Sequence, residues 1–180
     1  MSLAAVRCAR TSDLAPVQLA SARALMDAAF GGDFSDDDWT HALGGWHAIV
    51  EEGDVVIAHA AVVPRLLTVG THSVTVGYVE AVAVTPARQR TGLGSMVMRA
   101  IHEVIRREFA AGVLSTGEWP FYESLGWRRW QGPTFAREAS GALTRTEDDD
   151  DSLMVLEGRT RDPLDRTAPI VCDARAGDAW

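Results

Sequence analysis

The sequence has 180 residues, of which 47% are hydrophobic and 23% are charged, and its formal net charge is −8. This length and composition predict one globular domain over residues 1–180, with a core large enough to fold alone. The negative charge excludes the broad cationic surface with which proteins bind nucleic acid, so a cationic partner is favoured. Acidic residues spread evenly over the surface would instead serve solubility alone.

The first part of the chain is predicted to be helical. Thr-Ser-Asp at 11–13 followed by Pro16 is typical of a helix start, and the apolar spacing predicts a helix over 14–30. A Ser-x-x-Asp capping signal at 35–38 opens a second, short helix, which the glycine pair at 44–45 closes.

Strands are predicted next, because the hydrophobic pattern loses its helical period. Residues 47–50 and 55–63 predict an antiparallel hairpin whose second arm ends at Pro64. A third arm is expected over 66–69. A β-branched run over 73–84 predicts a long strand, which Thr-Pro then stops.

The second half of the chain begins with an amphipathic helix. Apolar residues recur at spacings of three and four from Val97 to Phe109, so the helix should end near Gly112. The other expected elements are a short strand at 113–115, a short helix over 121–125 closed by Gly126, and strands at 127, 152–157 and 170–172. This order predicts a mixed α/β domain.

A phosphate site is predicted where the 73–84 strand meets the following helix. Unpaired N–H groups and the positive dipole end of a helix N-terminus suit a phosphate or pyrophosphate. Gly92 and Gly94 allow close approach, and Arg88 and Arg90 can add charge-assisted contacts. Neither the P-loop motif nor the three-glycine dinucleotide motif is present. On these residues alone, an ordinary helix start remains an alternative.

Cysteine, histidine and hydropathy patterns narrow the protein class. Cys8 and Cys172 form neither a CxxC pair nor a regular disulfide framework. The first residues lack the apolar segment of a signal peptide, and no apolar run approaches bilayer length. The five histidines show no zinc-binding spacing, so they are interpreted as local structure and no metal is expected. We therefore expect a cytoplasmic protein that does not enter a membrane.

The phosphate loop belongs to a longer pattern. Gln89-x-x-Gly92-x-Gly94 resembles the coenzyme A signature of the GCN5-related N-acetyltransferase (GNAT) superfamily, and the Phe-Tyr-Glu-x-x-Gly-Trp motif at 121–127 matches the family in order and spacing. The resemblance implies a GNAT fold, in which a mixed central sheet splays at the acetyl-CoA site between flanking helices. The cofactor-binding residues that it implies, from the strand backbone and the loop, are Val82, Ala83, Val84, Gln89, Arg90, Thr91, Gly92, Leu93, Gly94 and Ser95.

Further motifs resemble the actinobacterial aminoglycoside 2′-N-acetyltransferases almost from end to end. They include Gly-Asp-Phe at 32–34, Gly-Tyr-Val-Glu at 77–80 and the Cys-Asp-x-Arg-Ala-Gly-Asp-x-Trp motif at 172–180. The resemblance implies transfer of an acetyl group from acetyl-CoA to the 2′-amino group of an aminoglycoside, by direct attack in a ternary complex. It also implies a homodimer.

Two residues are candidates for proton transfer. An amine attacks a thioester only as the free base, and Glu80 is a carboxylate within an otherwise apolar strand beside the loop, so it is the candidate base. A Glu80 side chain that faces solvent is the alternative. Tyr122 matches the general-acid tyrosine of the family, but on its own it reads equally as a half-buried core ring. Ser115 has no GxSxG elbow, and the resemblance assigns it to substrate contact.

Acidic residues are expected to hold the cationic acceptor, since ammonium groups favour charge-assisted contacts. The resemblance assigns substrate contact to these residues besides Ser115: Asp33, Glu80, Ala81, Asp148, Asp149, Asp178 and Trp180 with its α-carboxylate. The acidic run at 147–151 could also be a solvated loop, and the end of a chain is often frayed, although the aromatic final motif favours docking.

Two other functions remain open at this stage. The same scaffold acetylates other cationic amines, such as polyamines and peptide or cell-wall amines. A non-catalytic acyl-CoA-binding regulatory module is the second alternative, and the presence of both Glu80 and Tyr122 argues against it.

Overall fold

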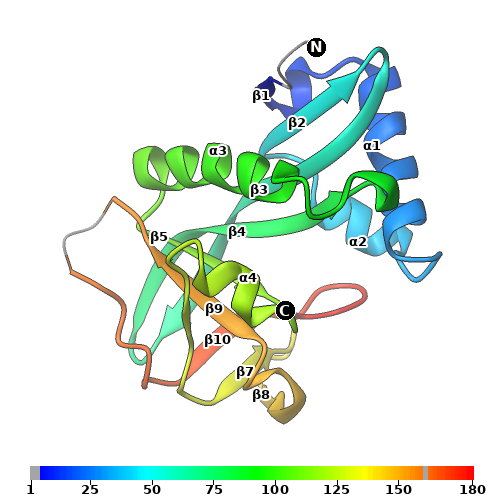
Figure 1. The fold of residues 1–180 in the computed structure, drawn as a ribbon. Coiled ribbons are helices and arrows are strands. Elements are labelled where there is room, and N and C mark those ends of the chain that lie inside the picture. Colours follow the sequence, from blue (N-terminus) through cyan, green and yellow to red (C-terminus); the bar gives the residue numbers. More distant parts are fainter. Residues whose placement is uncertain (1–4, 160–161) are drawn as a thin grey trace. The chain divides into compact units, whose positions relative to one another are not determined.

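The computed structural model describes residues 5–159 and 162–180 (Figure 1). In chain order the helices and strands are β1 (Val6–Arg10), η1 (Thr11–Asp13), α1 (Pro16–Ala29), α2 (Asp36–His41), β2 (Trp46–Glu52), β3 (Val55–Val69), β4 (His72–Val84), η2 (Pro86–Arg88), α3 (Leu93–Glu108), β5 (Ala111–Ser115), α4 (Trp119–Glu123), β6 (Arg128–Arg129), β7 (Thr134–Arg137), β8 (Leu143–Arg145), η3 (Glu147–Asp149), β9 (Leu153–Glu157) and β10 (Ile170–Asp173).

The chain divides into two compact units, each built from two separate stretches. Unit 1 comprises Met1–Val63 and Val79–Val104, and unit 2 comprises Pro64–Tyr78 and Ile105–Trp180. The single domain over 1–180 that the sequence suggests stays a prediction. Each unit is described by itself below.

Unit 1 is built on three antiparallel strands, β1, β2 and the first part of β3 (Figure 1). Helix α1 starts with Pro16 at its first position, where the missing N–H leaves no backbone bond unmade. Its apolar face, Ala22, Leu25 and Met26, is buried in one cluster with Ile49 of β2. Strand β1 was not predicted, because its Val-Arg-Cys-Ala-Arg sequence has no clear alternation of apolar and polar residues.

The β2–β3 hairpin was predicted, but its second arm does not stop at Pro64. Strand β3 runs through the proline to Val69, so the arm expected over 66–69 is its continuation. The β2 register ends at Val62, and the β10 register begins at Leu67. Pro64 lies between these two registers, so its missing N–H breaks neither of them.

A β-bulge interrupts the β2–β3 register between Val50 and Glu51. On the turn side Glu51 faces Val56, whereas beyond the bulge Ile49 faces His59. One extra residue on one strand changes which side chains share a face of the sheet. This shift is important for the histidines described below.

Helix α3 follows the predicted period. Its buried positions include Val97, Met98, Ile101, Val104 and Ile105, at spacings of one, three and four. The burial therefore confirms the amphipathic helix read from the sequence.

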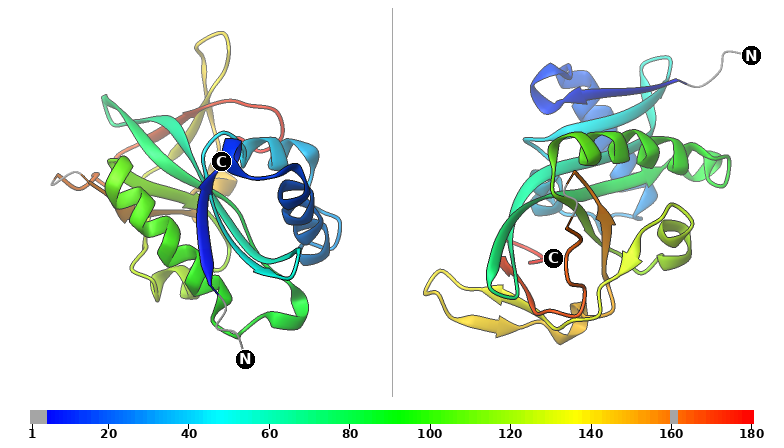
Figure 2. Two further views of the ribbon diagram at one scale, coloured as in Figure 1. Left: turned by 90° about the horizontal axis from the view of Figure 1, so that it is seen from above. Right: turned by 90° about the vertical axis from the view of Figure 1, so that its left-hand side faces the viewer.

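Unit 2 is organised around β5 and β10. Strand β5 pairs in parallel with β4 and antiparallel with β9, which also pairs with β6. Strand β10 pairs antiparallel with the last part of β3 and in parallel with β7, and β7 forms a hairpin with β8, drawn in yellow in Figure 2. These parallel and antiparallel pairs confirm the mixed α/β sheet. Strands β7 and β8 were not predicted, because they are too short to show a period.

Candidate functional site

The loop of residues 85–92 connects β4 to α3 in unit 1 and contains the first part of the predicted cofactor segment 89–95, whose last three residues begin α3. Its first turn is held by backbone bonds from the Thr85 N–H to the Ile57 carbonyl at 2.9 Å and from the Arg88 N–H to the Thr85 carbonyl at 2.8 Å. The Thr91 hydroxyl donates to the Arg88 carbonyl at 2.5 Å, and the Gln89 amide donates to the Val84 carbonyl at 3.4 Å. The loop is therefore ordered by bonds within itself and by bonds to the carbonyls of Ile57 in β3 and Val84 in β4.

The end of this loop has the conformation that an anion site needs. Gly92 has φ 89°, and a Cβ built on it would meet no atom within 4 Å, so its backbone is open to a ligand. Arg90 also has a positive φ, at 60°, and its side chain is exposed. The first N–H groups of α3 have no partner within the helix and form the positive end of its dipole. These features fit a pyrophosphate.

Arg88 differs from the sequence interpretation. Its guanidinium forms an ion pair with Glu52 at the end of β2, so the pairing satisfies part of the charge that was expected at the phosphates. Arg90 is the other arginine that the sequence placed at the loop.

Strand β4 carries the candidate base just before the loop. Glu80 is half-buried. It is therefore not fully exposed to solvent, which was the alternative considered from the sequence. Ala81 follows with φ 52°, a conformation that costs a non-glycine residue about 1–3 kcal/mol and persists only where its surroundings hold it. The Ala81 carbonyl accepts a hydrogen bond from His59 Nδ1 at 2.7 Å. The backbone therefore changes direction between Glu80 and the segment 82–84.

The pairing of β4 with β5 is short. The two registered pairs are Gly77 with Gly112 and Tyr78 with Val113, while β4 itself continues to Val84. In the described part of the chain, this register ends before Glu80.

Tyr122, the candidate acid, is buried in unit 2. Its ring makes edge contacts with Phe121, at 4.9 Å between centroids, and with Trp127, at 6.2 Å. Burial, with a smaller contribution from Glu118, raises the pKa of the Tyr122 phenol well above its usual value. Gly126 ends this turn with φ 93°, as predicted. The phenol is therefore protonated at neutral pH and can act as a proton donor.

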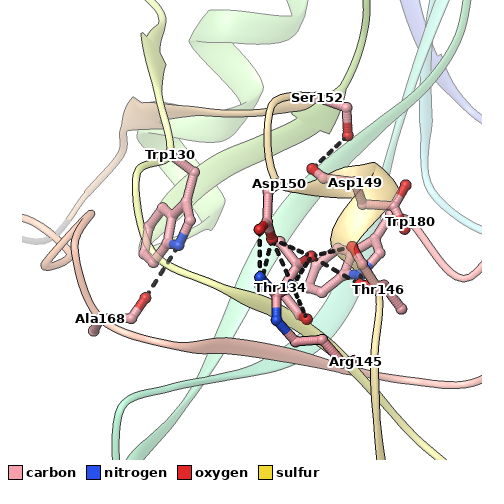
Figure 3. Close-up of polar contacts among 9 residues, drawn as sticks. All are labelled: Trp130, Thr134, Arg145, Thr146, Asp149, Asp150, Ser152, Ala168 and Trp180. Atoms are coloured by element: carbon pink, nitrogen blue, oxygen red, sulfur yellow. Dashed lines mark hydrogen bonds and ion pairs between the residues drawn. The ribbon is translucent and has the colours of Figure 1, made fainter.

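The acidic run after β8 has a structural centre in Asp150 (Figure 3). The carboxylate accepts hydrogen bonds from Arg145 Nη1 at 2.7 Å and from both the N–H and the hydroxyl of Thr134 at 2.9 Å. Hydrogen bonding to Arg145, with further bonds from Thr134, lowers the pKa of Asp150 to about 2. Asp150 was not predicted as a site residue, and its role here is to fix the loop.

The neighbouring carboxylates have a different environment. Burial first, and then the charges of Asp178 and Asp148, raise the pKa of Asp149. The structure thus brings together the acidic residues that the sequence assigned to the acceptor from two segments of unit 2. Ser115 lies close by, since its hydroxyl donates to Ser152 at 2.9 Å and Ser152 donates to the Asp149 carbonyl at 2.8 Å.

The last residue, Trp180, is docked and only 6% exposed. Its indole N–H donates to the Thr146 hydroxyl at 3.0 Å (Figure 3), and the Arg65 guanidinium lies over its ring at 5.8 Å. Arg65 also donates to the Ala179 carbonyl, which accepts a further bond from the Cys172 thiol at 3.4 Å. The docking expected from the final motif is confirmed, and the contact of Trp180 with a substrate stays a prediction.

The candidate residues are thus divided between the units. Unit 1 carries Asp33, which is exposed, together with Glu80, Ala81 and the whole cofactor loop. Unit 2 carries the others, namely Ser115, Tyr122, Asp148, Asp149, Asp178 and Trp180.

Sequence reasoning missed several residues that support these positions. His47 and His59 were assigned to local structure, and Arg65 and Asp150 were not singled out. An arginine in an apolar strand, which is the setting of Arg65, was the one usable signal. The histidines gave none, because the bulge that brings them together leaves no mark in the sequence.

Unit 2 also contains a cavity of about 380 Å³ that none of the predicted site residues lines. Its polar lining includes Arg106, Arg128, Arg166 and Glu157, around an apolar floor from β9. Its lining shares no residue with the acidic residues assigned to the acceptor.

Comparison with known proteins identifies the family. The protein-family model described as "Acetyltransferase (GNAT) domain" matches residues 12–130 of this chain. The aminoglycoside 2′-N-acetyltransferase of Mycolicibacterium fortuitum is 45% identical over 178 residues, which cover 97% of this chain and 91% of that protein. The chain belongs to the GNAT acetyltransferase family. Its enzymatic activity is therefore acyl transfer, and the acyl donor of this family is acetyl-CoA.

Solved structures support the GNAT fold. A GNAT-family N-acetyltransferase from Escherichia coli, solved in complex with CoA, aligns with a TM-score of 0.68 at 18% identity and covers 94% of this chain and 89% of that one. A GNAT acetyltransferase from Brucella melitensis, in complex with acetyl-CoA, aligns with a TM-score of 0.60 at 17% identity over 93% and 96% of the two chains. No described helix is long and apolar enough to cross a membrane.

Proposed function

We propose that this GNAT protein is an aminoglycoside 2′-N-acetyltransferase whose single domain spans residues 1–180. The observation that carries the proposal is the 45% identity to the M. fortuitum enzyme over nearly the full length of both proteins. The two acidic segments gathered in unit 2 support it, since an aminoglycoside presents several ammonium groups.

The acetyl donor binds along the loop in this proposal. The backbone of residues 82–84 pairs with the extended arm of acetyl-CoA, and residues 89–95 hold its pyrophosphate. The open backbone at Gly92 and the positive dipole end at the start of α3 support this assignment. Bound acetyl-CoA supplies an activated thioester carbonyl.

Glu80 acts as the general base. The acceptor arrives as an ammonium ion, and the Glu80 carboxylate takes one of its protons directly or through a water. The free amine nitrogen then forms a bond to the thioester carbonyl carbon, and the carbon–sulfur bond breaks as the nitrogen loses a second proton to solvent. The position of Glu80 immediately before the Ala81 turn and the loop supports this role.

Tyr122 acts as the general acid. The departing thiolate takes the phenol proton, and the phenolate is later reprotonated from solvent. The buried phenol is protonated at neutral pH, although its raised pKa also makes it a weaker acid, so a hydrogen bond to the departing sulfur precedes the transfer. No covalent acyl-enzyme forms, so Ser115 contacts the acceptor by a hydrogen bond and does not act as a nucleophile.

The acceptor is held by carboxylates. Asp33, Asp148, Asp149 and Asp178 pair with its ammonium groups, and the Ala81 backbone and Trp180 complete the contacts. Burial first, and then the charges of Asp178 and Asp148, raise the pKa of Asp149, and a bound cation would offset the repulsion among these carboxylates. We further propose a cytoplasmic homodimer; sedimentation or light scattering of the pure protein tests the dimer.

The decisive experiment compares two acceptors that differ only at the 2′ position. Thiol release from acetyl-CoA should occur with a 2′-amino aminoglycoside and not with its 2′-hydroxy counterpart. Glu80→Gln should lower kcat/KM by about 10²–10⁴-fold, the usual contribution of a general base. Equal rates with both acceptors would overturn the 2′ assignment, faster turnover of a polyamine would favour another amine acceptor, and CoA binding without turnover would favour a regulatory module.

A further inference from the structure

A continuous line of hydrogen bonds crosses the interior of unit 1 and ends at Ala81. Thr11 Oγ1 lies 2.7 Å from His47 Nε2, and His47 Nδ1 lies 2.8 Å from His59 Nε2. His59 Nδ1 then lies 2.7 Å from the Ala81 carbonyl oxygen. The Gly44 N–H reaches the other end, donating to Thr11 Oγ1 at 2.9 Å. None of these groups belongs to the predicted site except Ala81.

The last bond fixes the direction of all the others. A carbonyl oxygen only accepts, so His59 Nδ1 carries a proton and donates it to Ala81. In the neutral ring His59 Nε2 is then the acceptor, and His47 Nδ1 must donate to it. By the same logic His47 Nε2 accepts from the Thr11 hydroxyl at 2.7 Å, while the Gly45 carbonyl, the other possible acceptor of that proton, lies farther away at 3.4 Å. The line therefore has one proton arrangement, with both imidazoles neutral and protonated at Nδ1.

The surroundings keep both rings neutral. His47 and His59 are 0% exposed, and burial is the main cause that lowers the pKa of each. Trp39 lies beside His59, with 6.0 Å between ring centroids. Burying two imidazoles costs desolvation free energy that apolar side chains in the same core would not cost. The hydrogen bonds of these histidines therefore suggest a role beyond packing.

The end of the line is the strained point of β4. Ala81 has φ 52°, and it separates Glu80 from residues 82–84. The peptide between Ala81 and Val82 carries the carbonyl that His59 holds. Holding this carbonyl fixes ψ of Ala81, and with it the turn between Glu80 and residues 82–84.

We propose that His59, held in its tautomer by His47 and Thr11, is a positioning residue that fixes the Ala81 carbonyl and thereby the placement of the Glu80 carboxylate. The proposal rests on the proposed function, in which Glu80 is the base. His59 touches neither substrate, and it acts through the backbone of Ala81.

Two variants of His59 separate positioning from simple packing. In His59→Asn, the amide nitrogen takes the place of Nδ1 and can still donate to Ala81, but the link to His47 is lost. In His59→Gln, the amide takes the place of Nε2, so the link to His47 survives and the bond to Ala81 is lost. Each variant breaks one end of the line. The exposed His72→Gln is the matched control.

The variants should have similar free energies of unfolding in urea but different turnover. His59→Gln should lower kcat/KM by about 10²-fold through kcat, the effect of misplacing a reacting group by roughly 1 Å. His59→Asn should keep most of the activity, and His72→Gln should match the wild type. If His59→Gln and His59→Asn lose activity equally, in proportion to stability, the positioning role is overturned.

A double-mutant cycle with Glu80→Gln tests the route of the effect. Because His59 acts through Glu80, the loss caused by His59→Gln should largely disappear when Glu80→Gln is already present. Additive losses would overturn the proposal while leaving Glu80 as the base. Wild-type activity of Glu80→Gln would instead show that Glu80 is not the base. The failure of the positioning proposal and the failure of the proposed function thus give different results.

Discussion

The two units contain polar networks of opposite kinds. In unit 1, Thr11, His47 and His59 form a line of neutral groups in which both imidazoles are fully buried and Thr11 is half-buried. In unit 2, Arg145 and Asp150 form a half-exposed ion pair that also holds Thr134. Burial explains the difference, since a buried network is stable only when its groups stay uncharged or are fully paired. The first network orients a backbone turn, and the second holds a loop of like charges in place.

The largest expected difference between the networks is their response to acid. Histidines in the unfolded chain bind protons below about pH 6.5, whereas in the folded chain the pKa values of His47 and His59 are lowered to about 4 and about 3. The contribution of these neutral histidines to the free energy of unfolding is therefore fully present above about pH 6.5, and it is lost as the pH drops toward the folded-state pKa values. Between pH 7 and pH 5 the free energy of unfolding should fall by about 2 kcal/mol for each histidine.

Urea unfolding as a function of pH measures this loss. His47→Gln should remove about half of the pH dependence, while His72→Gln should keep it. The raised pKa of Asp149 acts in the opposite direction, because the folded state then binds its proton more readily as the pH falls. A stability that does not change from pH 7 to pH 5 would contradict the neutral, buried line.

The second prediction concerns the charged network. Asp150→Asn removes the acceptor charge for Arg145 and weakens the bonds from Thr134, so the free energy of unfolding should fall by about 2 kcal/mol. The exposed neighbour gives the control, and Asp151→Asn should change stability by less than about 0.5 kcal/mol. Because hydrogen bonding to Arg145 keeps the pKa of Asp150 near 2, the effect of Asp150→Asn should persist at pH 5. Similar stabilities of the two variants would show that the ion pair contributes nothing.

The smallest expected effect is at Trp180. Thr146→Val removes the hydroxyl that accepts the indole N–H and also bonds Thr134 and Asp149, and it should cost about 1 kcal/mol. Thr146→Ser keeps the hydroxyl and is the control. If docked Trp180 contacts the acceptor, the valine variant should also raise the KM for the aminoglycoside and leave the KM for acetyl-CoA unchanged. An unchanged KM for both would separate the docking of Trp180 from substrate binding.

The sequence was most informative where function depends on short local patterns. Gly92 before α3, the period of α3 and Gly126 after α4 are read within a few residues, and the structure gives both glycines a positive φ and buries the apolar face of α3. The family resemblance was also correct, because its motifs are local and lie in a fixed order.

Features that depend on pairing between distant residues were missed. Without the bulge at Val50, continuing the turn register would place His47 opposite Ala60 and His59 opposite Ala48, on opposite faces of the sheet. The bulge brings the two rings to one face, and no residue type announces it. Pro64 was misread for a related reason, since its tolerance depends on where two partner strands end.

The alternation of stretches between the units has a consequence for synthesis on the ribosome. Unit 1 lacks its Val79–Val104 stretch until well over half of the chain has been translated, and the Pro64–Tyr78 stretch of unit 2 must wait for residues that are made last. A truncated product of the first 63 residues would thus leave β3 incomplete and exposed. Its His59 ring would lack the Ala81 carbonyl as a hydrogen-bond partner. We expect nascent chains of this length to remain dependent on chaperones, and folding to become cooperative only when the final strands emerge.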